Sequence, residues 1–91
     1  MTVKVTLARS LADAIGGEHT LQMEGSTVGE VLRDLGERHA PLAQLLWRDR
    51  DALNPMLTVF RNQDDVRTLE GLATPVRPGD EVAVISAVDG G

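Results

Sequence analysis

The chain has 91 residues, and its 14 acidic and 9 basic side chains give a formal net charge of −5. This length is enough for a single domain with one core, and the absence of cysteine excludes disulfides, a thiol nucleophile and a thiolate metal site. Nucleic-acid binding is disfavoured because it requires a basic surface and aromatic platforms, whereas the only aromatics are Trp47 and Phe60. The acidity either favours docking on a basic protein groove or only keeps the domain soluble.

The N-terminal residues begin directly with a strand pattern and lack the basic and apolar regions of a signal peptide. No apolar run approaches the roughly 18 residues of a membrane span. We therefore expect a cytoplasmic protein that does not associate with membranes, which agrees with the absence of cysteine.

Alternating apolar residues predict two strands in the first part of the chain. Residues 2–8 place Val3, Val5 and Leu7 on one face, as in a half-buried strand. Residues 9–17 form a loop with room for a helical turn at 11–15, and residues 19–24 alternate again. Two such strands favour an antiparallel hairpin.

An amphipathic helix is predicted at 27–39. Thr27 and Glu30 have the spacing of a capping box, and four apolar residues form one stripe along the segment. These residues are Val28, Val31, Leu32 and Leu35. Gly29 and Gly36 lie inside the helix at a cost of about 1 kcal/mol each against alanine, so tertiary packing must hold it.

The second half contains shorter elements. We expect a short helix at 41–47, with Leu42, Leu45 and Leu46 available to the core, and then a polar connection at 48–55. These are followed by a strand at 57–62, a turn at 62–65, a short edge strand near Val66 and a strand at 82–88. A right-handed crossover through the main helix places the last strand beside the first and parallel to it. This β-β-α-β-β order predicts an α+β, ubiquitin-like β-grasp fold with a mixed sheet, one main helix and a short second helix. We assign 1–88 to this domain and 89–91 to a flexible Gly-Gly tail.

No catalytic or metal-binding constellation emerges from the remaining polar residues. His19 and His39 have no partner at metal-ligand spacing, and the aspartate pairs at 49/51 and 64/65 sit in polar turns where aspartate is common. Trp47 is predicted to lie in the core. We expect no active site, bound metal or bound cofactor in the chain itself.

The C-terminal residues suit a different role. Asp89, Gly90 and Gly91 follow the last strand, and residues 87–91 can extend by roughly 17 Å. Glycines pass a narrow channel and leave the terminal carbonyl open to attack. The carboxylate of Gly91 is a poor electrophile until another enzyme activates it, so we expect Asp89 and Gly90 to thread into that enzyme. A diglycine without a role is the competing interpretation.

Strand alternation also predicts a docking surface. Val82 and Val84 face the core, so Ala83 and Ile85 face outward, and exposed apolar residues of this kind often mark binding sites. Phe60 joins this surface if its strand presents the same face. Asp65, Glu81 and Asp89 are candidates for an acidic rim.

The chain resembles the MoaD/ThiS family of ubiquitin-like sulfur carriers over its whole length. The similarity is densest in "FRNQDDVRTLEGLATPVRPGDEVAVISAVDGG", residues 60–91, and looks most like the CysO-type carriers of cysteine synthesis. The resemblance implies that an E1-like adenylyltransferase/sulfurtransferase uses ATP to activate Gly91, which then becomes a thiocarboxylate. It also implies that Ile85 lies at the apolar position that such proteins use to bind activating enzymes.

The implied sulfur acceptor is a cysteine synthase or a thiazole-, molybdopterin- or thiosugar-forming synthase, and a JAMM-type metalloprotease is a possible further partner. Two alternatives to a sulfur carrier stay open. The first is a protein modifier that is joined to lysines through Gly91, and the second is a β-grasp interaction module with an inert tail. We expect a monomer, because the tail must be free.

Overall fold

The computed structural model describes residues 2–49 and 51–87 and confirms the predicted β-grasp fold. The main elements are the strands β1 (Val3–Leu7), β2 (Thr20–Met23), β5 (Leu57–Arg61) and β7 (Glu81–Ser86) and the helices α2 (Val28–Arg38) and α3 (Ala40–Leu46). The smaller elements are α1 (Arg9–Asp13), β3 (Trp47–Asp49), β4 (Ala52–Leu53), β6 (Asp64–Asp65) and the 3₁₀ turns η1 (Val66–Thr68) and η2 (Gly71–Ala73).

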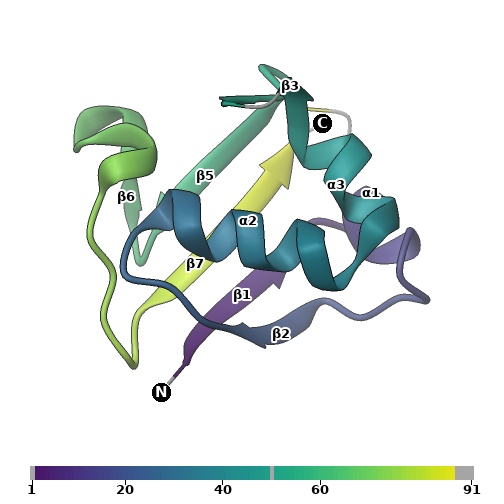
Figure 1. The fold of residues 1–91 in the computed structure, drawn as a ribbon, viewed down its shortest axis with the longest axis horizontal. Coiled ribbons are helices and arrows are strands. Elements are labelled where there is room, and N and C mark those ends of the chain that lie inside the picture. Colours follow the sequence, from purple (N-terminus) through teal and green to yellow (C-terminus); the bar gives the residue numbers. More distant parts are fainter. Residues whose placement is uncertain (1, 50, 88–91) are drawn as a thin grey trace.

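The main sheet is mixed and has the order β2-β1-β7-β5-β6 (Figure 1). β7 runs parallel to β1, with Val5 opposite Val82, and antiparallel to β5, with Val59 opposite Val84. β1 and β2 form the predicted antiparallel hairpin. The last strand is therefore central and hydrogen-bonded on both sides, as the sequence predicted.

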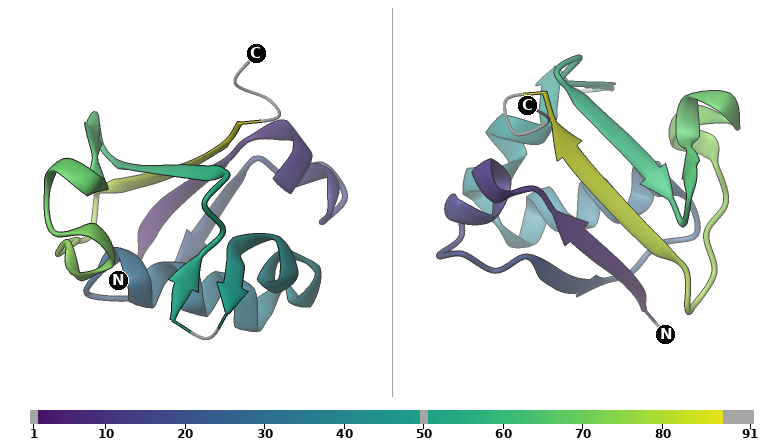
Figure 2. Two further views of the ribbon diagram at one scale, coloured as in Figure 1. Left: turned by 90° about the horizontal axis from the view of Figure 1, so that it is seen from above. Right: turned by 180° about the vertical axis from the view of Figure 1, so that it is seen from behind.

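One face of the sheet is covered by α2 and α3, and the other is left uncovered (Figure 2). The core lies between the sheet and these helices and includes Val5, Val82 and Val84 from the sheet and Leu32 and Leu42 from the helices, all 0% exposed. The uncovered face is therefore the surface of the sheet that is open to a partner.

Local contacts explain how α2 is held. The Thr27 hydroxyl accepts a hydrogen bond from the Glu30 N–H at 3.1 Å, as in a capping box. The Glu30 carboxylate accepts from the backbone N–H of Ser26 at 2.8 Å, and not from that of Thr27 as a complete capping box requires. A Cβ at Gly36 would lie 3.3 Å from the Cβ of Ala43 in α3. The glycine allows α3 to approach, so this tertiary contact offsets its low helix propensity.

Three local predictions were incomplete. The segment 48–55 contributes to a two-stranded sheet, β3–β4, and does not form a simple connection. Leu45 is exposed on α3 instead of joining the core. Trp47 only packs against the edge of the core, and the Arg33 guanidinium lies 4.7 Å from its ring centroid.

The predicted last strand at 82–88 was shifted. β7 begins at Glu81 and ends at Ser86. The predicted boundary between the domain 1–88 and the tail 89–91 lies outside the described residues and stays a prediction. None of the helices formed by residues 2–49 and 51–87 has the length and apolarity to cross a bilayer.

Candidate functional site

The outward residues of β7 form the centre of the candidate docking face. Val82, Val84 and Ser86 are buried against the helix side, whereas Ala83 is half-buried and Ile85 is 39% exposed. This pattern confirms the predicted orientation of β7, because successive side chains of a strand point to opposite faces.

Strand pairing shows which face Phe60 occupies. Phe60 lies opposite Ala83, and Thr58 lies opposite Ile85, in the antiparallel β5–β7 ladder. Residues that face each other in a ladder point to the same side of the sheet. Phe60, Ala83 and Ile85 therefore share the uncovered face of the sheet.

Two of the three charged residues predicted as a rim form ion pairs with cations of the same chain. The Glu81 carboxylate accepts a hydrogen bond from the Thr6 hydroxyl and lies 3.9 Å from the Lys4 ammonium nitrogen. The Arg67 guanidinium donates to the Asp65 carboxylate at 2.8 Å, and this hydrogen bond is the main reason that the pKa of Asp65 lies below its ordinary value. Both charges are thus partly neutralised, and the third candidate, Asp89, lies outside the described residues.

The point at which the chain leaves the sheet is fixed by backbone hydrogen bonds. Ala87, directly after β7, donates its N–H to the carbonyl of Met56 at 2.9 Å. Asp89, Gly90 and Gly91 follow in the sequence but lie outside the described residues, so their roles as threading and sulfur-carrying residues stay predictions. The described structure contributes the base from which these residues start.

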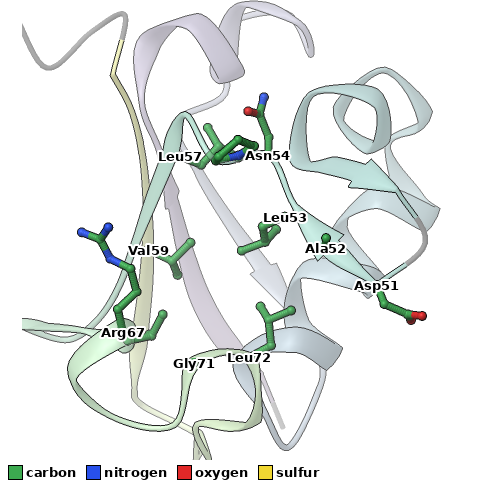
Figure 3. Close-up of a pocket in the computed structure, with 11 residues that line it drawn as sticks. Asp51, Ala52, Leu53, Asn54, Leu57, Val59, Arg67, Gly71 and Leu72 are labelled. Atoms are coloured by element: carbon green, nitrogen blue, oxygen red, sulfur yellow. The ribbon is translucent and has the colours of Figure 1, made fainter.

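An apolar cavity of about 370 Å³ lies on the helix side, between β4, β5 and the 3₁₀ turns (Figure 3). Leu53, Val59 and Leu72 point into it, whereas Asp51 and Arg67 point away from its centre. Sequence analysis missed this cavity, because its walls come from separate short elements that no local pattern connects. Its lining offers apolar contact and not acid–base chemistry.

The two histidines have separate structural surroundings. His19 Nδ1 lies 3.1 Å from the carbonyl oxygen of Leu7, and His39 joins α2 to α3. Within the described part of the chain, no three histidine, aspartate or glutamate side chains gather in a way that suits a metal ion.

A β-grasp domain with an open sheet face beside its C-terminal strand is typical of small ubiquitin-like proteins. The ThiS family model matches residues 5–91, and the chain belongs to this family. Sulfur carrier protein CysO of Mycobacterium tuberculosis is 31% identical over 93 residues, with 100% of both chains covered. Proteins of the ThiS/CysO type are carriers rather than catalysts, so this chain is a small carrier protein and not an enzyme.

Solved structures of a CysO chain and of an archaeal modifier protein have a similar fold. A chain in the Amycolatopsis orientalis BexX/CysO complex matches with a TM-score of 0.82 and 34% identity, covering 98% of this chain and 99% of that one. Small archaeal modifier protein 1 of Methanosarcina acetivorans matches with a TM-score of 0.87 and 29% identity, covering 99% and 96%.

Proposed function

We propose that this protein is a sulfur carrier that holds sulfur as a thiocarboxylate on Gly91. The observation that supports this proposal most directly is the family match, which runs through residue 91 and so includes the diglycine. The full-length similarity to CysO sulfur carriers agrees with it. The central position of β7 adds a physical reason, since a tail that follows a strand paired on both sides starts from a firmly held base.

The chemistry proceeds in three steps. The Gly91 carboxylate attacks the α-phosphorus of ATP in an E1-like enzyme, which forms an acyl adenylate and releases pyrophosphate. A sulfide equivalent then attacks the carbonyl carbon, and AMP leaves with the C–O bond electrons, which gives –C(=O)S⁻. The thiocarboxylate sulfur finally attacks an activated carbon of a biosynthetic acceptor and displaces its leaving group, and hydrolysis of the resulting acyl–sulfur bond returns the Gly91 carboxylate.

Glycine at the last two positions suits these steps. Attack on the carbonyl requires close approach along a defined direction, and a side chain on the reacting residue would misplace the nucleophile. Gly91 presents no Cβ, and Gly90 can adopt dihedral angles that other residues avoid. The carrier needs no catalytic group of its own, because the partner enzyme supplies ATP and the acid–base chemistry.

The uncovered sheet face is the surface that we assign to the activating enzyme. Ile85 supplies an exposed apolar centre, Ala83 leaves space beside it, and Phe60 contributes an aromatic edge. Exposed apolar anchors of this kind carry most of the binding energy in protein interfaces. The CysO/BexX complex shows that a CysO chain forms a complex with a protein partner, and by similarity we propose an acceptor synthase, such as a cysteine synthase, as a later partner here.

Intact mass spectrometry tests the proposal. The purified protein is incubated with ATP, a sulfide source and a lysate of its own host, and is compared with a variant that lacks Gly91 and with a reaction without ATP. We expect an ATP-dependent gain of one sulfur-for-oxygen exchange that maps to the C-terminal peptide and is absent from the deletion variant. An unchanged mass in a lysate with working activating enzyme would refute the proposal.

A protein modifier is the second candidate. The similarity to small archaeal modifier protein 1 favours it, and the same activated Gly91 would form an isopeptide bond with a lysine amine. In the same experiment, high-molecular-weight conjugates that contain the C-terminal peptide would show this activity. If neither conjugates nor the mass gain appear, an interaction module with an inert tail is the remaining interpretation.

A further inference from the structure

We propose a second contact site for the tail-modifying enzyme, on the opposite side of the sheet from Ile85, which takes an apolar side chain of that enzyme. The site, named here the exit pocket, is a cavity of about 240 Å³ at the carboxyl end of β7. Its apolar walls are Leu11, Leu45, Met56 and Leu57, and the polar residues Ser10, Asn54 and Ser86 complete it. This inference rests on the proposed function, since it requires an enzyme that acts on Gly91.

The exit pocket is preformed by a hydrogen-bond network around Asn54. The Asn54 side-chain amide donates to the carbonyl of Leu45 at 3.1 Å, and its backbone N–H donates to the carbonyl of Leu46 at 2.8 Å. Its side-chain oxygen accepts from the N–H of Met56 at 3.0 Å. One residue thus joins the end of α3 to the start of β5, so that both walls of the pocket hold a fixed position without a ligand.

The walls of the exit pocket expose more apolar surface than the fold requires. Met56 is 53% exposed and Leu45 is 39% exposed, and both belong to the small set of large apolar side chains that the described structure leaves at the surface. Two such residues beside one cavity indicate an interaction site more strongly than scattered exposed residues do. Methionine also adapts its shape to different partners.

The size of the exit pocket favours a protein side chain as its occupant. Small-molecule sites usually enclose about 300–1,000 Å³, and this cavity is smaller and lined mainly by aliphatic groups. We therefore assign it to one apolar side chain of a protein partner.

The position of the exit pocket indicates that this protein partner is the enzyme that acts on Gly91. Ser86 ends β7 and lines the pocket, and Ala87 is hydrogen-bonded to Met56 on the pocket wall. Residues 88–91 connect Ala87 to the Gly91 carboxylate of the proposed function, and these four residues extend by at most roughly 14 Å. Any enzyme that holds Gly91 in its active site must therefore approach this corner of the domain, where α1, α3 and β7 meet (Figure 1).

Two charge substitutions test the assignment against a matched control. Leu45→Glu and Met56→Glu place a carboxylate on the pocket wall. Leu69→Glu changes a residue whose exposure, 38%, nearly equals that of Leu45 and which lies next to η1 and does not line the pocket. The rate of ATP-dependent thiocarboxylate formation is measured in host lysate by intact mass, at several carrier concentrations. Thermal melting of each variant confirms that it is folded.

We expect Leu45→Glu and Met56→Glu to slow the reaction at least tenfold at low carrier concentration and to approach the wild-type rate at saturation, while Leu69→Glu stays within twofold of wild type. A loss at all concentrations would indicate a structural effect and overturn the docking assignment. Wild-type rates in all three variants would also overturn it, although the proposed function would stand.

Two other outcomes point elsewhere. If the wild-type protein gains no sulfur, the proposed function fails and this inference fails with it. If the free wild-type protein sediments as a dimer that Leu45→Glu dissociates, a second copy of the chain occupies the exit pocket, and the assignment to an enzyme is wrong.

Discussion

Ile85→Glu is the substitution that most directly tests the uncovered sheet face. Full burial of an isoleucine side chain contributes about 1.5–3 kcal/mol, and Ile85 is 39% exposed, so its loss costs the fold roughly 1–2 kcal/mol. Replacing a β-branched residue in a strand adds less than about 1 kcal/mol. Domains of this size have about 5–15 kcal/mol of stability, so we expect the variant to remain folded, with a lowered melting temperature.

The effect on activation is expected to be larger than the effect on folding. Truncation of a hot-spot residue costs about 2 kcal/mol or more, which corresponds to roughly thirtyfold in affinity, and a buried carboxylate adds a desolvation cost. We therefore expect thiocarboxylate formation at sub-saturating carrier to fall at least thirtyfold, as measured by intact mass in the lysate reaction. Leu69→Glu again serves as the control. An undiminished rate in a folded Ile85→Glu protein would refute the assignment of this face.

Three further substitutions test the account of the fold. Leu42→Ala removes a side chain that is 0% exposed between α3 and the core, and we expect urea unfolding to show a loss of about 2–5 kcal/mol; a loss below 1 kcal/mol would contradict the close packing of α3. Gly25→Ala would place a Cβ 2.8 Å from the backbone nitrogen of Val31, and we expect about 1–3 kcal/mol of destabilisation, whereas an unchanged urea midpoint would show that the chain relaxes there. Asp80→Asn tests a pKa that is lowered chiefly by the Arg77 backbone N–H and then by the Asn62 side chain. This carboxylate stabilises the fold above its ordinary pKa of 3.8 and loses that effect as the pH falls through its lowered pKa. The variant should therefore lose about 1 kcal/mol of unfolding free energy at neutral pH and have the same stability as wild type in acid. An equal difference in unfolding free energy at both pH values would show that the ionised carboxylate is not the cause.

The sequence predicted the main sheet well because its strands carry their own signals. Apolar residues alternate in β1 and β2, and the order of elements leaves few topologies when crossovers are right-handed. The β3–β4 pair was missed for a physical reason. Its strands have three and two residues with a register irregularity between Trp47 and Asp49, so they are too short to show a period.

The candidate site was predictable to different degrees. Alternation placed Ala83 and Ile85 on the outer face because orientation is a local property of a strand. The face of Phe60 depends on its pairing with Ala83, which is a property of the ladder and not of either segment. The exit pocket forms where α1, α3, β5 and β7 come together at one corner of the domain. No sequence pattern within a single segment predicts such tertiary contacts.

The central position of β7 connects the fold to the proposed role of the tail. β7 is hydrogen-bonded to β1 on one side and to β5 on the other, whereas β2 and β6 lie at the edges of the sheet. Detaching β7 therefore requires opening the core, and segments of this kind unfold locally only at a high cost in free energy. The start of the tail is thus held in a fixed position relative to both Ile85 and the exit pocket. An enzyme that grips these two surfaces consequently fixes the origin of residues 88–91, and only those four residues need to be guided into its active site.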